Sequence, residues 1–484
     1  MAGTGKTSIA KTVCERATAD PEIMLGGSFF CSRTGVSAQR DIRCVVPTLA
    51  QLMARQSMEF SIALAQEIAR DRDVQHKIAA AQVKQLLHVP LLAIKDSRAP
   101  ILFVIDALDE CGGDSSDGVL DNMKSHGIVS SMLKALVSLT ESEPNLPVKF
   151  LVTSRPEAQI RDTSISDEKL SHILRLHSID TEEVEADIGR YITNAINDEL
   201  SVKPKFQGII TDSDMKDLVR LCDGLFIVAA TAIKHTFNAG ADAAVARFKK
   251  LLNASGNSLS AGAAAPLDRM YELILTDAAR VSGSEATELP ALLRLLASIL
   301  SARMTLSIAA LADLLNLEPY DVRASLSLLH AVVYVPEDDN TPGLRTLHAS
   351  FGDYLLDRAP ASISIPQLLG HETLTHACLD VMGKYLRFNI SQTASSYEPK
   401  PSKRPDCITL SLEYACLHWA HHIDATSDTL AVDAKVDQKF RPKFLFWLEV
   451  LSTLHNVNLA SKLLLMASSA VSQLPHPPFS FSIV

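Results

Sequence analysis

The feature that most constrains the fold of this chain is a short glycine-containing segment near its beginning, Gly3-Thr4-Gly5-Lys6-Thr7. It fits the second half of the pattern G-x-x-x-x-G-K-[ST]. In this pattern glycine lets backbone N–H groups turn toward phosphate oxygens, the lysine reaches the β- and γ-phosphates, and the threonine hydroxyl contacts Mg²⁺. A helix is expected from about Thr7 to Ala17, with its positive N-terminus facing the anion. The segment predicts a phosphate-binding loop, although five residues alone could also form an accidental loop.

The pattern lacks its own beginning. Its first glycine would fall one residue before Met1, and the strand that normally leads into such a loop would lie further upstream. In related folds that contain such a loop this strand is central in the sheet, so its absence would leave neighbouring strands with unpaired backbone groups, each costing ~1–3 kcal/mol. We therefore expect the chain as given to be unstable in its first domain, and its true start to lie upstream.

An acidic segment follows a second candidate strand. Residues 101–105 read Ile-Leu-Phe-Val-Ile and lead into Asp106, and Asp109 and Glu110 come directly afterwards. A continuous apolar strand is typical of a parallel sheet that is buried on both faces, and its carboxyl end is where such sheets bind ligands. Asp106 would hold Mg²⁺ through water, and Asp109 or Glu110 could orient or deprotonate the attacking water. The alternative is a buried strand that runs into an acidic loop, which the phosphate-binding pattern disfavours.

A third apolar run, over 148–153, ends in Ser154-Arg155. In a parallel sheet Arg155 would emerge at the same edge as Asp106. A guanidinium there can sense a γ-phosphate because it pairs well with phosphate oxygens. The alternative is a surface arginine at a strand end.

Three strand ends in this order resemble a signal-transduction P-loop NTPase of the NACHT class. The segment FVIDALDEC is the most specific part of the resemblance, which continues in GGSFFCSR (26–33), CDGLFIVAATAI (222–233), LDRMYELIL (267–275), LRTLHASFGDYLLD (344–357) and SLEYACLHWAHHI (411–423). The chain is similar to fungal nephrocystin-like NACHT proteins of the STAND class, relatives of animal and plant immune receptors, with its start truncated at the phosphate loop. The resemblance implies an ATP/ADP switch that is closed with ADP, opens and oligomerises with ATP, and is reset by slow hydrolysis.

The resemblance also implies the residues of the site. Nucleotide would bind to Gly3, Thr4, Gly5, Lys6, Thr7, Ser8 and Asp106; Mg²⁺ would bind to Thr7 and Asp106; and Asp109, Glu110 and Arg155 would act in catalysis. His348 falls where related switch proteins hold a histidine against the β-phosphate of ADP, and the alternative is a buried histidine satisfied by backbone groups. No N-K-x-D stretch of the kind that reads guanine is found, so ATP is preferred to GTP.

The chain divides into five expected segments. They are an α/β nucleotide-binding domain (1–178, strands at 26–31, 101–106, 148–153 and 172–177), a helical domain (179–252), a linker (253–266), a winged-helix-like domain (267–358) and a C-terminal helical region (359–484). Within the first domain, helical patterns cover 43–70 and 74–95, and 112–127 reads as a polar insertion. In the third domain, helical stretches at 290–301, 307–315 and 319–330 precede a hairpin of 331–335 and 344–347. The expected fold is an α/β P-loop NTPase domain that lacks its first strand, in a chain that is mostly α.

Composition limits the partners. The net charge of −10 and the absence of a basic field argue against nucleic acid. No apolar run approaches the ~20 residues that span a bilayer, and no secretory signal is evident, so we expect a cytoplasmic protein with no membrane partner. Eight scattered cysteines indicate reduced thiols. Cys416, His418, His421 and His422 invite a zinc interpretation, but a shared helix face explains this segment better.

Two classes of function remain open. The leading one is the nucleotide switch, with weak ATPase activity and with protein partners, including further copies of itself, bound through the helical regions. The other is a degenerate NACHT scaffold that binds partners without nucleotide. A metabolic kinase is a distant third, because no substrate site is visible. A role in fungal self/non-self recognition is implied by the resemblance alone.

Overall fold

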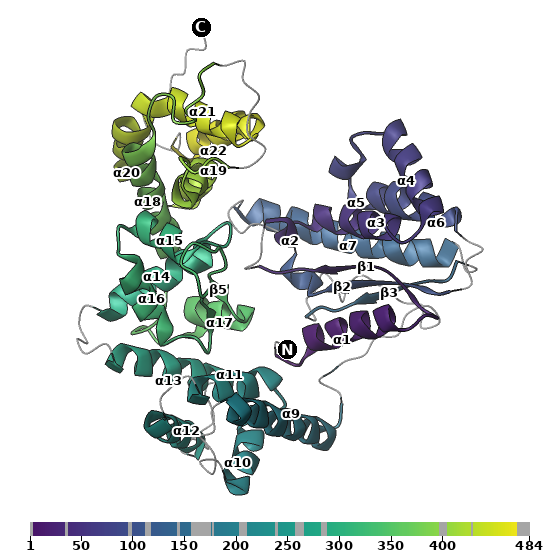
Figure 1. Ribbon diagram of the computed structural model, residues 1–484, viewed down its shortest axis with the longest axis vertical. Helices are drawn as coiled ribbons and strands as arrows, with labels where there is room; N and C mark the ends of the chain where they lie inside the picture. The colour runs from purple at the N-terminus through teal and green to yellow at the C-terminus, as the bar shows by residue number, and fades with distance from the viewer. Residues whose placement is uncertain are drawn as a thin grey trace. The chain divides into compact units, whose positions relative to one another are not determined.

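The computed structural model describes residues 3–33, 37–94, 99–111, 118–142, 146–155, 176, 179–202, 211–237, 241–256, 266–281, 288–395, 404–426 and 429–471. These residues are mostly helical, with a small parallel sheet near the N-terminus (Figure 1). The chain separates into two compact units, Met1–Ile233 and Lys234–Val484, and each is described by itself.

The first unit contains a parallel sheet of three strands in the order β1 (Met24–Phe30), β2 (Ile101–Asp106) and β3 (Val148–Val152). The central strand carries the apolar run, and Phe103, Val104 and Ile105 are fully buried. Their burial on both faces explains why β2 is continuously apolar. These three predicted strands are confirmed, whereas the expected strand at 172–177 lies, except for residue 176, outside the described residues.

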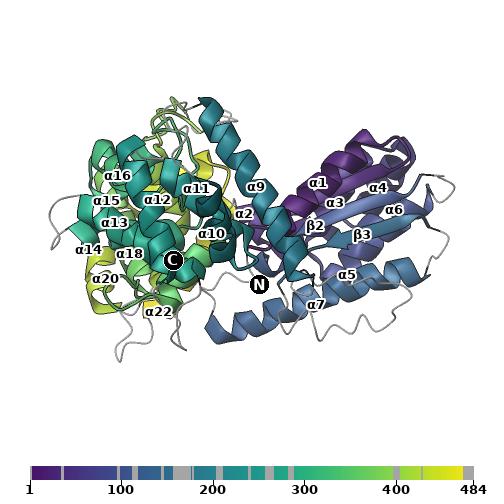
Figure 2. The same ribbon diagram turned by 90° about the horizontal axis from the view of Figure 1, so that it is seen from below.

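Helices cover both faces of the sheet. Helix α1 (Lys6–Ala19) contacts β1 and β2 on one side, while α3 (Val45–Ala54) and α7 (Gly118–Ser142) pack on β1 and β3 on the other. Figure 1 shows these layers from the side, and Figure 2 views the same sheet from the side of α1. The helix expected after the glycine loop is confirmed, slightly longer than predicted.

The helical pattern over 43–70 is broken once. It forms a short 3-10 turn (Ile42–Cys44), α3 and α4 (Met58–Arg70). The break falls at Ser57, whose hydroxyl accepts a hydrogen bond of 3.2 Å from the Phe60 N–H and so caps α4. A serine at this position stabilises a new helix start, because it satisfies one of the otherwise unpaired N–H groups.

The second helical pattern contains a widened turn. After a 3-10 turn (Val74–His76), α5 (Ala79–Gln82) continues into a π-helix, η3 (Val83–His88), and then into α6 (Val89–Leu92). The Val89 N–H bonds to the Lys84 carbonyl, five residues earlier. Pro90 explains the widening, because proline has no N–H and its ring clashes with the carbonyl four residues before it.

The prediction of a polar insertion at 112–127 is wrong for residues 118–127. Residues 112–117 lie outside the described residues, but the backbone from Gly118 onward already belongs to α7. Extending a helix costs much less than starting one, so the apolar helix over 128–142 propagates into the polar residues before it.

The described residues of the first unit from 180 onward are mostly helical, as predicted. They contain α9 (Thr181–Val202), α10 (Asp212–Cys222) and the first part of α11 (Phe226–Phe237). Asp180 accepts a hydrogen bond of 3.0 Å from the Glu182 N–H at the start of α9. A full capping box begins α10, where Thr211 and Asp214 bond each other's backbone N–H groups.

The second unit begins within α11 and continues through a set of helices that precede a small hairpin. The helices are α12 (Ala241–Gly256), α13 (Pro266–Val281), α14 (Glu288–Ser301), α15 (Ile308–Leu315) and α16 (Pro319–Ser327). Residues 257–265, most of the expected linker, lie outside the described residues. The predicted hairpin is confirmed: β4 (Val333–Tyr334) and β5 (Arg345–Thr346) pair antiparallel. After it come α17 (Ala349–Asp353) and a π-helical turn, η7 (Tyr354–Arg358).

Further helices complete the second unit. They are α18 (Leu369–Tyr385), α19 (Leu410–Asp424), α20 (Thr429–Lys435), η8 (Val436–Phe440), η9 (Arg441–Lys443), α21 (Phe444–Thr453), η10 (Val457–Leu459) and α22 (Ala460–Val471). Trp419, Phe440 and Trp447 pack in its core in tilted and edge-to-face contacts, and the Trp447 indole N–H donates to the Cys416 carbonyl at 2.9 Å. Among the described helices, none is both long enough and apolar enough to cross a bilayer.

Candidate functional site

The glycine loop has the backbone conformation that only glycine adopts easily. Gly3 and Gly5 have φ values of 81° and 87°, in the left-handed region. Gly5 is the N-cap of α1, and no side chain caps the helix there. No acidic side chain lies in the first turn of α1. The N-terminus of α1 therefore presents N–H groups and a positive dipole end without a built-in anion.

Lys6 lies close to the acidic strand end that follows β2. Burial lowers its pKa, while Asp109, Asp106 and Glu110 act in the opposite direction and Arg155 adds to the lowering. These influences fall off with distance, so Asp106, Asp109, Glu110 and Arg155 all lie within electrostatic range of Lys6. Thr7 and Ser8 lie exposed in the first turn of the same helix, and Thr4 precedes it in the loop.

Asp106 is fixed at the end of β2 by the neighbouring strand. Its carboxylate is 1% exposed and accepts a hydrogen bond of 2.5 Å from the Thr153 hydroxyl, directly after β3. The same hydroxyl accepts the Ala107 N–H at 2.9 Å. Ala107 has a φ of 52°, which is unfavourable for any residue with a side chain, and this bond holds it there.

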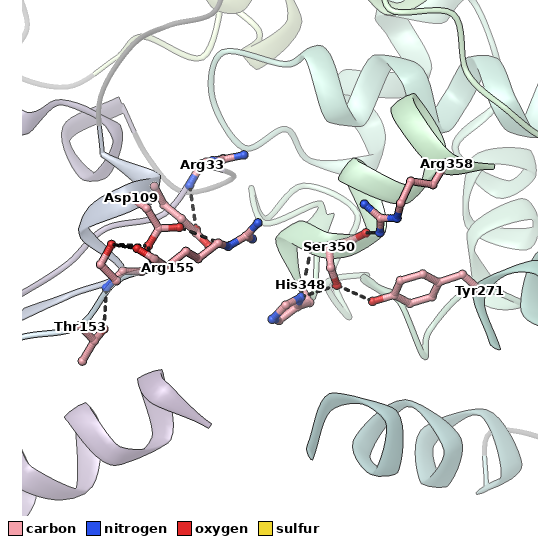
Figure 3. A network of polar contacts seen from close by, with 11 residues as sticks. Arg33, Asp109, Thr153, Arg155, Tyr271, His348, Ser350 and Arg358 are labelled. Atoms are coloured by element: carbon pink, nitrogen blue, oxygen red, sulfur yellow. Dashed lines mark hydrogen bonds and ion pairs between the residues drawn. The ribbon is translucent and has the colours of Figure 1, made fainter. Parts of the chain in front are cut away.

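Asp109 and Arg155 form a tight pair. One carboxylate oxygen of Asp109 accepts the Arg155 backbone N–H at 2.9 Å and the Ser154 hydroxyl at 3.2 Å, and the other lies 3.2 Å from the guanidinium Nε. Figure 3 shows the two side chains paired after β2 and β3. They are 2% and 20% exposed, so solvent screens this pair little. Asp109 thus serves first as the anchor of Arg155.

Glu110 is held from a different side. One of its carboxylate oxygens accepts the Arg33 N–H at 3.3 Å, and the other lies 4.0 Å from the Arg155 guanidinium. Burial, and then the neighbouring charge of Asp109, raise the pKa of Glu110, while Arg33 and Arg155 partly offset this. A buried carboxyl with a raised pKa can exchange a proton near neutral pH more readily than an exposed one.

Three contributors to this site were not singled out from the sequence. Arg33 and Thr153 lie beside strand ends that the sequence marked, so their position after a strand was the available signal. The third is Ile227 of α11, whose N–H donates to the Gly3 carbonyl at 3.3 Å. A Cβ on Gly3 would lie only 2.1 Å from Cγ2 of Ile227. The start of α11 therefore packs directly against the glycine loop, a contact with no local sequence pattern.

His348 belongs to the second unit, so its predicted place beside the nucleotide remains a prediction. It is the N-cap of α17, and its Nδ1 accepts the Ser350 N–H at 3.2 Å. The Ser350 hydroxyl lies 2.6 Å from that Nδ1 and 2.8 Å from the Tyr271 hydroxyl (Figure 3). Arg358 binds both carboxylate oxygens of Asp268 at 3.0 Å and stabilises the same region.

The histidines of α19 have protein partners. His422 is fully buried, with its Nε2 2.8 Å from the Tyr414 hydroxyl and its Nδ1 3.0 Å from Nδ1 of His371. Among the described residues, no group of three or more His, Cys, Asp or Glu side chains is arranged to hold a metal ion.

The N-terminal part of the chain has a recognised relative. Residues 1–155 match the family described as Nephrocystin 3, N-terminal. This match ends at Arg155, so it spans the glycine loop and all three strand ends. No curated protein matches the chain. The nephrocystin-like character expected from the sequence is thus confirmed for residues 1–155.

Proposed function

We propose that the nephrocystin-like N-terminal domain binds ATP and ADP together with Mg²⁺, and that the chain acts as a nucleotide-dependent switch with weak ATPase activity. The observation that supports the proposal is that Lys6, at an uncapped helix N-terminus, lies within electrostatic range of the acidic end of β2 and of Arg155. Cation, helix dipole and acidic cluster are the parts that a phosphate–Mg²⁺ ligand requires.

The residues present fit such a ligand. Backbone N–H groups of the loop, from Gly3 to Ser8, would surround the phosphates, because Gly3 and Gly5 already have the necessary φ values. Lys6 would neutralise the phosphates, and Thr7 and Asp106 would hold Mg²⁺. The bound Mg²⁺–nucleotide supplies the reactive γ-phosphate. Thr153 keeps Asp106 oriented, since its hydroxyl binds one carboxylate oxygen and leaves the other for a ligand.

Arg155 provides a reason for the protein to distinguish ATP from ADP. In the structure its guanidinium pairs with Asp109. A γ-phosphate would compete with Asp109 for that guanidinium, so ATP would loosen the Asp109–Arg155 pair and ADP would leave it intact. Glu110, with its raised pKa, is the better candidate for accepting a proton from water, because Asp109 is already committed to Arg155.

The contact between Gly3 and Ile227 supports a coupling between the glycine loop and helix α11. Any shift of the loop on nucleotide binding would move the start of α11, because Ile227 packs on Gly3 with no free space. We further propose that His348 contacts the β-phosphate of ADP in a closed state. We also propose that the helical regions bind protein partners, including further copies of the chain, in the cytoplasm.

The test is the nucleotide content of the gently purified full chain, released by denaturation and identified by chromatography. The unaltered chain should release ADP or ATP near one per chain. Lys6→Ala should lose it and bind fluorescent ADP at least about tenfold more weakly, because hydrogen bonds to charged groups are strong. The matched control is Lys11→Ala, an exposed lysine further along α1, which should behave like the unaltered chain.

Two results would overturn the proposal. A folded chain that neither carries nor binds nucleotide would favour a scaffold that works without it. Equal nucleotide binding by Lys6→Ala and Lys11→Ala would show that the phosphates do not bind at the glycine loop.

A further inference from the structure

A separate cavity, wide open to solvent, lies in the first unit between helices on the face of the sheet that α1 does not cover. Its volume is about 740 Å³, inside the ~300–1,000 Å³ range of small-molecule sites. Its walls come from the helix over 79–92 and from α7. The lining residues are Ala80, Val83, Lys84, His88, Ser130, Ser131, Lys134, Ala135, Ser138 and Leu139.

The charged residues that line the cavity are all basic. Lys84 on one wall and Lys134 on the other both have exposed side chains, and none of the lining residues that the structure describes is acidic. Neither ammonium group has a hydrogen bond or an ion pair with a described residue. Two cations that face one cavity repel each other and attract an anion, so the cavity is charged to receive one.

The other lining residues add hydrogen-bond donors and an apolar surface. Ser130, Ser131 and Ser138 lie along one face of α7 and bring hydroxyl groups to the cavity. Ala80, Val83, Ala135 and Leu139 supply the apolar part. A phosphate monoester carries a charge of about −2 and three strong acceptor oxygens, which matches two ammonium groups and several hydroxyl groups.

The backbone at the cavity is irregular, because Pro90 widens the helix there. The π-helical turn η3 contributes Val83, Lys84 and His88 to the lining, and it is the widened part of an otherwise α-helical segment. A π-helical turn displaces side chains from the positions that they would have on a regular α-helix. Here the displaced turn carries one of the two lysines.

We infer that this cavity binds a phosphate monoester of a small organic molecule, with the phosphate between Lys84 and Lys134 and the organic group against the apolar wall. The site shares no residue with the glycine loop and does not depend on nucleotide binding there.

The test uses the full chain with Lys6→Ala, so that the glycine loop does not contribute to anion binding. Equilibrium dialysis measures the binding of phenyl phosphate, benzenesulfonate and inorganic phosphate. Phenyl phosphate should bind most tightly. Benzenesulfonate has the same ring but a single charge, and inorganic phosphate has the charge but no ring.

Substitutions then locate the site. Lys84→Gln and Lys134→Gln should each weaken phenyl phosphate binding about tenfold, because each removes a charge-assisted hydrogen bond. Lys216→Gln, an exposed lysine on α10, is the matched control and should change nothing. All three side chains are exposed, so circular dichroism should show an unchanged fold.

Three outcomes would overturn the inference. The first is no binding of phenyl phosphate by the folded chain. The second is binding that Lys84→Gln and Lys134→Gln leave unchanged. The third is inorganic phosphate binding as tightly as phenyl phosphate, since the apolar wall would then have no role.

Discussion

Acidification should destabilise the second unit through one buried histidine pair. His371 on α18 and His422 on α19 face each other, with 3.0 Å between their Nδ1 atoms. Burial, and then the charge of Arg303, lower the pKa of His371 to about 4. Burial, followed by His371, His418, Arg303 and His421, lowers the pKa of His422 well below its usual value. Both imidazoles are therefore neutral in the folded protein near pH 7.

The sign and size of the loss of stability follow from comparing the protonation of His371 in the folded and the unfolded chain. Above pH 6.5 His371 is neutral whether folded or unfolded, so it contributes no pH dependence. As the pH falls below 6.5, the unfolded chain binds the proton first, which favours unfolding until the folded pKa is reached. At ~1.4 kcal/mol per pH unit, His371 alone removes about 2 kcal/mol of unfolding free energy near pH 5 and about 3 kcal/mol near pH 4.

The assay is urea denaturation of the full chain near pH 7.5 and near pH 5, followed by tryptophan fluorescence, because Trp419 and Trp447 both lie in this unit. His371→Gln keeps a hydrogen-bonding group beside His422 but cannot bind the proton. Its loss of stability on acidification should be about 2 kcal/mol smaller than that of the unaltered chain. His376→Gln on the same helix is the control.

The reasoning fails if His371→Gln and the unaltered chain lose the same stability between the two pH values. It also fails if His376→Gln reduces the pH dependence of the unfolding free energy as strongly as His371→Gln does.

The first unit yields three further predictions, all measured by urea denaturation. Ala107→Gly should raise the unfolding free energy by about 1 kcal/mol, because it relieves a left-handed φ that costs ~1–2 kcal/mol; a destabilised variant would contradict the strain. Asp109→Ala should lower it by about 3 kcal/mol, since the largely buried Arg155 charge loses Asp109 and keeps Glu110 only at 4.0 Å, and an unchanged midpoint would show that the pair contributes nothing. Thr211→Ala should cost ~1 kcal/mol through loss of the α10 cap, and Thr211→Ser should restore it.

Local patterns were enough to predict the central features of the site. The glycine loop, the strand that ends in Asp106 and the strand before Arg155 each have a short, recognisable sequence. Because parallel strands end at one edge of the sheet, these patterns together also predicted that Asp106 and Arg155 would follow neighbouring strands at that edge, as they do. The helix after the loop and the antiparallel hairpin followed from periodicity and turn residues in the same way.

Contacts between distant segments were not predictable from such patterns. Ile227 packs on Gly3, yet nothing around either residue indicates the other. Arg33 binds Glu110 through its backbone N–H, which any residue except proline could supply. The early start of α7 was missed because helix propagation depends on the residues that follow, and the polar composition before residue 128 gave the opposite signal. The role of Asp109 as an anchor for Arg155 likewise required the geometry.

At the widened turn beside the phosphate-monoester cavity, the number of residues in the helix decides which side chains line the cavity, as much as the identity of those side chains does. A π-helical turn holds one residue more than an α-helical turn, so the helix over 79–92 is geometrically an α-helix with one inserted residue. Deleting one residue between Lys84 and Leu91 would rotate Lys84 by ~100° relative to Leu91. Pro90 would have to change as well, because it opposes the regular helix. A one-codon insertion or deletion could therefore create or abolish the cationic wall, and related chains would gain or lose this cavity abruptly.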